Sequence, residues 1–398
     1  MTDKPQFVGE KVASITIGEL GKTQSGGTPS SKHPEYFDGE IPWIGTTALK
    51  GGFLDKTDAI KLITEEAVAK SATKIVPARS VMVGIRVGVG KVGINSVPMC
   101  TSQDVVSIVG IDERFWDKEY IALALKHKAP MLVAQAQGAT ITGITSKTLK
   151  AITIPIRSKD EQTRIVCQLN EIGRQLTNAE RQIAKLDQLT KSRFVEMFGD
   201  LSSYEAKTLR ECVTGIESGN SPKCLTRPRI GNEPAVLKLS ALSSGTYREE
   251  ENKALPSDVE IREEKEVVDG DILLARKNTP ELVGRSVLVN HTAGNIMFPD
   301  IVFRMHVRGG INEVFLSHVL ANPLFGSIRS FAHGSAKSMS NIPKSELAKL
   351  AVPLPPLSFQ QEFADFAAQV DKSRFIAQQQ IEKLQMLYDS LAQEYFGE

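Results

Sequence analysis

Two stretches of the chain carry apolar residues at alternating steps of four and three. In the first stretch, apolar or small residues stand at Ile165, Leu169, Ile172, Leu176, Ala179, Ile183 and Leu186. This spacing is a heptad seam, typical of a helix that pairs with another helix. Pro155 marks an extended segment before the helix, and Gly199 stands where the helix should end. The pattern predicts a helix of about 35 residues, or about 52 Å.

The second stretch repeats the first without a gap. Residues 352–398 align with residues 154–200 at an offset of 198, and twelve of the 47 positions are identical. Ordinary residue usage would give roughly three identities. The identical pairs include Gln162 with Gln360. The second seam comprises Phe363, Ala367, Val370, Arg374, Ala377, Ile381, Leu384, Tyr388 and Leu391, in which only Arg374 is charged.

A single long helix cannot bury such a narrow apolar stripe on its own. The favoured interpretation is that the two helices pair as an antiparallel coiled coil, with an intervening globule that lets the second helix return beside the first. Two equal units packed in this way predict pseudo-twofold symmetry. The alternative is that each helix packs on its own globule.

The segments that precede the helices predict two α+β globules. Strands are expected at 81–83, 92–94, 105–109, 272–275, 286–289 and 301–307. Helices are expected at 112–127, with Asp112 as the candidate cap, and at 312–333, with Pro323 as a candidate interruption. The two segments correspond loosely, as 25–29 with 218–222, Ala48-Leu49 with Ala241-Leu242, Ser80–Arg86 with Asp271–Arg276, Gly90-Lys91 with Gly284-Arg285, and Gly138 and Ile144 with Gly334 and Ile342. The predicted organisation is a globule at 1–153, a helix at 154–200, a globule at 201–351 and a helix at 352–398.

Composition places the chain among ordinary globular proteins. It has 398 residues, of which 41% are hydrophobic and 24% charged. Its 48 Lys and Arg residues balance 47 Asp and Glu residues, so nucleic-acid binding would depend on local basic patches. The chain shows no secretory signal and no long apolar run, and we expect it in the cytoplasm.

Catalytic and metal-binding motifs find no support. The four cysteines and six histidines lack zinc-ligand spacing. Residues 88–93 satisfy G-x-G-x-x-G, but a strand-like segment follows where a dinucleotide site needs a helix, so a glycine hairpin is favoured. Residues 322–325 resemble an amino-group methyltransferase motif, with a Leu in place of its second Pro. We therefore expect a chain that is not an enzyme on its own.

Polar and basic residues on loops and strand ends are the remaining candidates. Arg can pair with guanine, Gln or Asn with adenine, and Lys and hydroxyl groups suit phosphates. Arg86 and Arg276 stand out, because each ends a predicted strand. For any single candidate, a solvated surface residue is the alternative. The candidate DNA contacts are Thr46, Thr47, Arg86, Lys91, Gln103, Lys238, Arg276, Lys277, Asn278 and Arg285, within a wider set that adds Ser25, Thr28, Lys32, Ser102, Asn220, Lys223, Arg227, Arg229 and Lys337.

Several strings give the chain a family resemblance over nearly its full length. They are 41–44 (IPWI) followed by Leu49, the runs 80–91 and 138–144, 154–156 (IPI), and 352–357 (VPLPPL) followed by Gln360. With the duplicated globule–helix plan, they make the chain resemble the DNA-specificity subunits of type I restriction-modification enzymes.

The resemblance implies that each globule is a target-recognition domain that reads one half of a split, asymmetric DNA site. It implies that the coiled coil sets the spacing and docks two modification subunits, which use S-adenosylmethionine to methylate adenine. Restriction subunits, with ATP and Mg, would join that core, and this chain itself would hold no cofactor. The docking residues would be those of the seam: Ile165, Leu169, Ile172, Leu176, Ile183, Leu186, Phe363, Val370, Ile381, Leu384, Tyr388 and Leu391.

Two other functions compete with this one. A coiled-coil scaffold would dock partners through the same helices without reading bases. An enzyme acting alone would transfer methyl groups without a partner.

Overall fold

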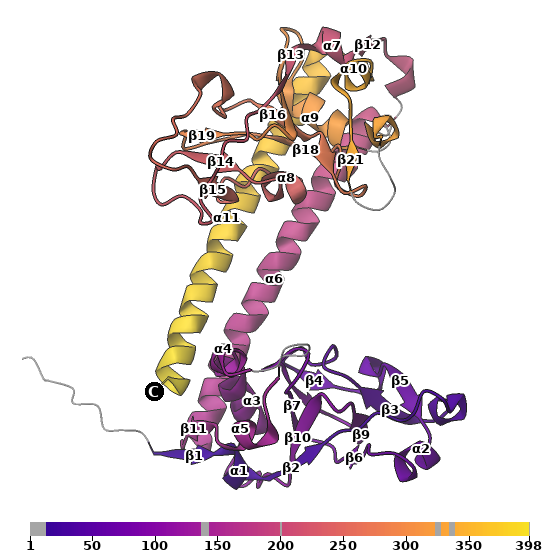
Figure 1. Ribbon diagram of the computed structural model, residues 1–398, viewed down its shortest axis with the longest axis vertical. Coiled ribbons are helices and arrows are strands. Elements are labelled where there is room, and N and C mark those ends of the chain that lie inside the picture. The colour runs from indigo at the N-terminus through magenta and orange to yellow at the C-terminus, as the bar shows by residue number, and fades with distance from the viewer. Residues whose placement is uncertain (1–12, 137–142, 200, 323–327, 334–338, 398) are drawn as a thin grey trace, which may run out of the picture. The chain divides into compact units, whose positions relative to one another are not determined.

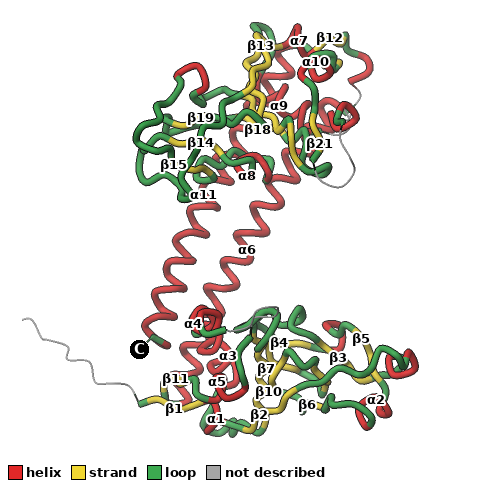
Figure 2. The backbone as a smooth tube through the Cα atoms, in the orientation of Figure 1, coloured by secondary structure: helices red, strands yellow, loops and turns green. Residues whose placement is uncertain are grey.

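A computed structural model describes residues 13–136, 143–199, 201–322, 328–333 and 339–397 (Figure 1). The chain forms two compact units, Met1–Glu180 with Gln378–Glu398, and Arg181–Ala377. Each unit therefore takes part of both long helices, α6 (Lys159–Phe198) and α11 (Leu357–Phe396), of 40 residues each. These helices confirm the two predicted from the heptad pattern and are slightly longer than expected. The fold is α+β, as predicted (Figure 2).

The first unit is built on a five-stranded sheet in the order β2-β10-β7-β8-β4. A second sheet has the order β5-β3-β9-β6, and β1 pairs with β11. The strands are β1 (Ser14–Thr16), β2 (Lys22–Ser25), β3 (Ile41–Ile44), β4 (Phe53–Leu54), β5 (Lys61–Ile63), β6 (Ile75–Val76), β7 (Val81–Gly84), β8 (Val92–Asn95), β9 (Met99–Thr101), β10 (Val105–Val109) and β11 (Thr153–Pro155). The helices are α1 (Ile17–Leu20), α2 (Glu65–Ala69), α3 (Lys118–His127), α4 (Ala129–Ala134) and α5 (Ser146–Lys150), with 3-10 turns at Pro34–Phe37 and Lys56–Asp58.

The central strands of this sheet are buried on both faces. Val81 and Val83 pack into the core that contains α3, whereas Met82 packs with Ile44 and Met99 of the second sheet. Successive residues of a strand point to opposite faces, so a continuous apolar run suits a strand covered on both sides. The three strands predicted in this unit are confirmed. The helix expected from residue 112 is shorter: it begins at Lys118, and Asp117 caps it by accepting main-chain N–H bonds from Glu119 and Tyr120.

The second unit has a four-stranded sheet in the order β13-β20-β16-β18 and a three-stranded sheet in the order β15-β14-β19. Two short pairs, β12 with β22 and β17 with β21, complete it. The strands are β12 (Ala206–Thr208), β13 (Val213–Ser218), β14 (Ala235–Leu237), β15 (Asn252–Ala254), β16 (Ile272–Ala275), β17 (Lys277–Asn278), β18 (Ser286–Leu288), β19 (Ile296–Met297), β20 (Val302–Val307), β21 (Ser340–Asn341) and β22 (Ala351–Pro353). The helices are α7 (Leu209–Cys212), α8 (Ser240–Ser243), α9 (Glu313–Ala321) and α10 (Lys344–Leu347), with 3-10 turns at Leu201–Ser203, Glu263–Lys265 and Ile328–Phe331. The strands predicted at 272–275, 286–289 and 301–307 are confirmed, and α9 covers only the first part of the helix expected at 312–333.

The two units repeat one plan. Strands β2, β10, β7 and β8 of the first occur in the same order as β13, β20, β16 and β18 of the second. Each short helix α1 and α7 opens with a capping box, formed by Thr16 with Glu19 and by Thr208 with Glu211. The internal repeat predicted from the sequence therefore extends through the globules.

In the first unit, the beginning of α6 and the end of α11 share one core with the globule. Ile165 and Leu169 of α6 join a cluster with Ala392 and Phe396 of α11, and the Phe396 ring lies 5.3 Å from that of Tyr120 on α3. The Tyr395 hydroxyl donates a 2.8 Å hydrogen bond to Gln168. Early residues of one helix thus meet late residues of the other, which is an antiparallel pairing.

In the second unit, the end of α6 meets the beginning of α11. Phe194 and Phe198 pack with Phe363 of α11 and Phe315 of α9, with ring centroids 5.0–6.0 Å apart. Arg193 forms a 2.9 Å ion pair with Glu362. In both units, the helices pack on each other and on the globule, so the two packing alternatives coexist.

The seam residues differ in burial. Ile165, Leu169, Ile172, Phe363 and Val370 are buried. The others in the predicted docking set are half-buried: Leu176, Ile183, Leu186, Ile381, Leu384, Tyr388 and Leu391. Arg374, which interrupts the seam, bonds to Asp187 at 3.2 Å and pairs with Asp371.

A buried glutamine attaches the start of each long helix to its globule. The Gln162 side-chain oxygen accepts the main-chain N–H of Asp117 at 2.7 Å, and its amide nitrogen donates to the carbonyls of Phe115 and Arg157, each at 2.9 Å. Gln360 accepts the N–H of Asn312 at 2.9 Å and donates to the carbonyl of Pro355 at 2.7 Å. Asp117 and Asn312 cap α3 and α9, so the identical pair seen in the sequence makes the same contact twice.

We expect Gln162→Met to lower the free energy of unfolding of the first unit by about 1–3 kcal/mol, because main-chain groups would lose their buried partners. Trp43 and Trp116 are the two tryptophans of the chain and both lie in the first unit, so their fluorescence during urea unfolding reports this unit. Gln175→Met, at an exposed position of the same helix within the first unit, is the control. A loss no larger than that of the control would contradict the assignment.

Candidate nucleic-acid interface

Most candidates of the first unit come together at one edge of the five-stranded sheet. Ser25 at the end of β2 is paired with Val106, and Gly84 at the end of β7 is paired with Val105 at the start of β10. Neighbouring antiparallel strands alternate in direction, so these ends share one edge. The loops at these strand ends carry Arg86, Lys91 and Gln103, and all three side chains are exposed.

Main-chain hydrogen bonds hold this edge. The N–H of Ile85 donates to the carbonyl of Asp104 at 2.8 Å, and the N–H of Gly84 donates to that of Lys91 at 2.8 Å. The Arg86 guanidinium lies 4.0 Å from the Asp104 carboxylate and remains half exposed. Such a distant, exposed pair contributes little stability, so the Arg86 guanidinium is available to another anionic partner.

Thr46 and Thr47 follow β3 in a tight turn closed by the N–H of Ala48 on the carbonyl of Gly45. Thr47 is exposed, whereas Thr46 is buried with its methyl group beside Gly84. The structure therefore offers Thr47, and not the Thr46 side chain, to a ligand at this edge.

The second unit presents the equivalent edge with different side chains. The Arg276 guanidinium bonds to Ser218 at 3.2 Å and to Asn341 at 3.4 Å, and it lies 5.1 Å from the centroid of the Phe303 ring. Lys277 is exposed, and Arg285 is half-buried with its Nε atom unpaired among the described residues. Asn278 is buried and accepts the N–H of Thr279, which leaves its side chain less accessible.

Other basic candidates of the second unit are held by carboxylates. Lys238 lies 2.9 Å from Glu251, Arg227 lies 2.6 Å from Glu233, and Arg229 pairs with Glu249. These ion pairs connect the loops around β14 and β15. The three cations are therefore less available to a ligand than Lys277 is. Lys337 lies outside the described residues.

Pairing Arg86 with Arg276 as equivalent positions is wrong. Gly84 pairs with Val105 as Ala275 pairs with Val302, which makes Ile85 the counterpart of Arg276. Ile144 donates its N–H to Ile85, as Ile342 does to Arg276. The loops are unequal in length, so matching them by sequence shifted the register by one residue.

The correspondence of Gly90-Lys91 with Gly284-Arg285 is confirmed. Gly90 and Gly284 donate their N–H groups to Gly84 and Ala275, and both have positive φ, at 81° and 77°. The glycine-rich string 88–93 lies in the hairpin between β7 and β8, as expected of a turn. Within the described ranges, no three His, Cys, Asp or Glu side chains are grouped to hold a metal ion.

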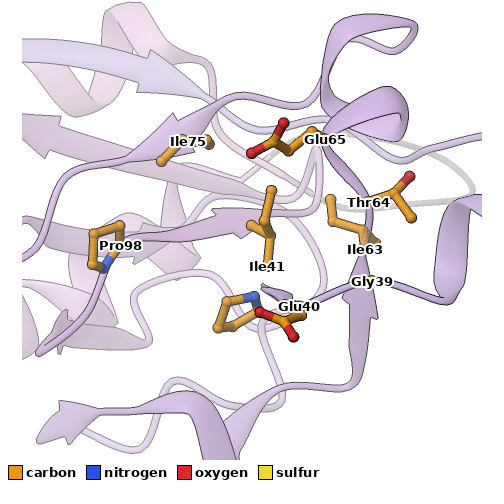
Figure 3. A pocket seen from close by; sticks show the side chains of 9 residues that line it. Gly39, Glu40, Ile41, Ile63, Thr64, Glu65, Ile75 and Pro98 are labelled. Atoms are coloured by element: carbon orange, nitrogen blue, oxygen red, sulfur yellow. The ribbon is translucent and has the colours of Figure 1, made fainter.

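A separate pocket of about 480 Å³ opens on the second sheet of the first unit (Figure 3). Ile41, Ile63 and Ile75 line it, and its charged members are the carboxylates Glu40 and Glu65. Carboxylates repel phosphate, so this pocket is not part of the candidate interface. The sequence contains no signal that distinguishes it from ordinary sheet packing.

Comparison with known proteins defines the class. The family model of the type I restriction modification DNA specificity domain matches residues 9–188. This match confirms, over residues 9–188, the resemblance seen in the motifs. Among the described residues, no helix combines the length and apolar character that a bilayer crossing requires.

Particular relatives agree. The chain is 33% identical over 153 residues to the type I restriction enzyme EcoEI specificity subunit of Escherichia coli, which covers 38% of this chain and 26% of that protein. It is 28% identical over 235 residues to the MjaIX specificity subunit of Methanocaldococcus jannaschii, which covers 58% and 53%. The matches thus span about a quarter to a half of these relatives. Both relatives are specificity subunits of type I restriction enzymes, the class that the sequence resemblance indicated.

A solved structure shares the fold. The S subunit of a type I restriction-modification system from M. genitalium superposes with a TM-score of 0.56 over 98% of both chains, at 15% identity. At this identity, the likeness concerns the fold.

Proposed function

We propose that this chain is the sequence-specific DNA-binding subunit of a type I restriction-modification complex, in which each unit reads one half of a bipartite, asymmetric site. The observation that carries the proposal is the repeated sheet edge. The same strand order presents Arg86, Lys91 and Gln103 in one unit and Arg276, Lys277 and Arg285 in the other. One scaffold with two sets of side chains suits two different half-sites.

The long helices would set the distance between the half-sites. Half-sites read from one face of the duplex lie about one helical turn, or roughly 34 Å, apart, and paired helices provide a rigid spacer. Their half-buried seam residues would dock two modification subunits, which bring S-adenosylmethionine for adenine methylation. Restriction subunits, with ATP and Mg, would join through them in the cytoplasm. The near-neutral chain fits a complex in which partners supply part of the phosphate contact.

The test is an exchange of residues 1–153 for the matching segment of a relative with a different target. The chimera and the parent are each expressed with the modification subunits, and methylated adenines are mapped across the host genome. We expect one half of the motif to change while the other half and the spacer length stay the same. Exchange of residues 201–351 is the matched control and should change the opposite half.

Each alternative function predicts a different map. A change in both halves after one exchange would contradict modular reading. No sequence preference with the partners present would favour a scaffold. Methylation by the purified chain without partners would favour an enzyme acting alone.

A further inference from the structure

A basic pocket of about 300 Å³ adjoins the candidate edge of the first unit. Its charged members are Lys50, Lys91 and Lys126, and its nine lining residues include no carboxylate. The lysines come from three separate segments: the loop after the Thr46 turn, the hairpin between β7 and β8, and α3. Chain folding thus brings together three positive charges that are far apart in the sequence.

The backbone of this pocket is firmly held. The N–H of Gly51 donates to the carbonyl of Val92 at 2.8 Å, which joins the Lys50 loop to β8. The hairpin presses against α4, because a methyl group at Gly90 would lie 2.5 Å from the Ala129 Cβ atom. Gly51 and Gly90 also have positive φ, at 91° and 81°, a conformation that glycine adopts readily. The lysines therefore project from a preorganised frame.

The three ammonium groups keep their charge available. Lys50, Lys91 and Lys126 are exposed, and the ion pairs formed among the described residues include none of them. The Lys126 ammonium lies 5.5 Å from the centroid of the Tyr388 ring and 4.0 Å from where a methyl group at Gly51 would stand. An aromatic face attracts a cation without neutralising it. The distance to Gly51 places the Lys126 ammonium beside the pocket, and the ring contact leaves its charge for a ligand.

We propose that this pocket binds a backbone phosphate of the DNA beside the bases that the Arg86–Lys91 loop faces. This inference rests on the proposed function. A phosphate is small, anionic and accepts several hydrogen bonds, which suits a pocket lined by three lysines and no carboxylate. Phosphate contacts carry no sequence information but fix the register of a protein on the duplex. The pocket would therefore position the first unit for base reading.

The second unit has a weaker version of the site. By the shared strand register and helix caps, Ser243, Arg285 and Ala321 stand where the first unit has Lys50, Lys91 and Lys126. Arg285 alone is charged, and one of its terminal nitrogens lies 3.9 Å from where a methyl group at Gly245 would stand. We therefore assign the stronger phosphate contact to the first unit.

The test measures DNA binding by the complex with its modification subunits on a duplex that carries its mapped target. Lys50→Ala with Lys126→Ala should weaken binding about 10-fold and reduce the slope of log affinity against log salt by about 1, equally for target and unrelated DNA. The methylated motif should not change. Lys147→Ala on α5 is the control. Helix α5 contacts α1, which precedes β2, so Lys147 lies at the end of the sheet opposite to the candidate edge.

A second measurement identifies the phosphate. A set of duplexes is prepared in which one phosphate, at a different position in each, is replaced by an uncharged methylphosphonate. The parent complex should bind more weakly when the replaced phosphate is the one beside the first half-site that the pocket binds. The variant that carries both Lys50→Ala and Lys126→Ala should bind that duplex and the unmodified duplex equally well. Tryptophan fluorescence on urea unfolding checks that the variant is folded.

Three results would overturn the inference: an unchanged affinity and salt slope, additive losses at every methylphosphonate position, or loss of subunit assembly with DNA binding retained. The last would assign the pocket to a protein partner. Failure of the proposed function looks different, because the parent complex itself would then show no preference for a target.

Discussion

Phe194→Ala is expected to lower the free energy of unfolding of the second unit by about 3–5 kcal/mol, the usual cost of deleting a fully buried aromatic ring. Phe194 is 1% exposed and lies 5.1 Å from the ring centroids of both Phe198 and Phe363. It also faces His318 at 5.8 Å, and burial there lowers the pKa of that imidazole. A truncated ring would leave a cavity where α6, α11 and α9 meet.

Amide hydrogen exchange of β16 and β20 measures this loss, since both strands belong to the second unit. The tryptophan fluorescence transition, which reports the first unit, should move much less. Phe375→Ala provides the control, because Phe375 is on α11 in the same unit but is 62% exposed. A Phe194→Ala effect below about 1 kcal/mol would mean that the aromatic cluster does not hold the helices to the globule.

The second large effect concerns a buried charge cluster. We expect Arg304→Met to destabilise the second unit by about 3–5 kcal/mol, because it leaves a buried carboxylate without its cation. Arg304 bonds to Glu217 at 2.8 Å, donates to the carbonyl of Glu266 at 2.8 Å and lies 3.9 Å from Asp271. Asp271 is fully buried, and His306 lies 3.0 Å from it.

The pH dependence has a definite sign. Burial raises the pKa of Asp271, so the folded chain holds this proton to higher pH than the unfolded chain does. The carboxylate therefore costs stability as the pH rises above its unfolded pKa. Loss of Arg304 raises the folded pKa further, so the deficit of Arg304→Met should be larger at pH 7 than at pH 4. Hydrogen exchange or urea unfolding at both pH values checks this.

The first unit suggests the rescue. Ser80 and Ser107 occupy the positions that correspond to Asp271 and Arg304. The double change Asp271→Ser with Arg304→Ser should recover roughly 1 kcal/mol or more at pH 7, because it removes both charges together. A double variant less stable than Arg304→Met would contradict the argument.

The sequence predicted the repeated parts of this protein well because repetition is visible without coordinates. The heptad seams defined both long helices, and the identical Gln162 and Gln360 proved to share one structural role. Strand pairs around Gly90 and Gly284 were matched correctly, since a positive φ and close neighbouring atoms favour glycine in both units. These features depend on backbone requirements that recur in each copy.

Other features depend on contacts between distant segments. Asp112 and Asp117 both precede an apolar run. In the folded chain Asp117 caps α3, and its N–H is held by the distant Gln162. The position of Arg276 depended on loop length, which sequence matching could not resolve. Lys126 was missed because nothing in its helix points to Lys50 or Lys91. The candidate site was therefore predicted as a set of loops, but not as a set of neighbours.

The buried glutamines also bear on how such a protein acquires a new globule. Gln162 and Gln360 hold only main-chain groups, and the cap residue beneath them is Asp117 in one unit and Asn312 in the other. Main-chain groups are the same whatever the side chain. A foreign globule whose corresponding helix begins with the same main-chain turn would form the same hydrogen bonds with the glutamine. A recombination event at the start of a long helix would then leave this hydrogen-bonded joint intact.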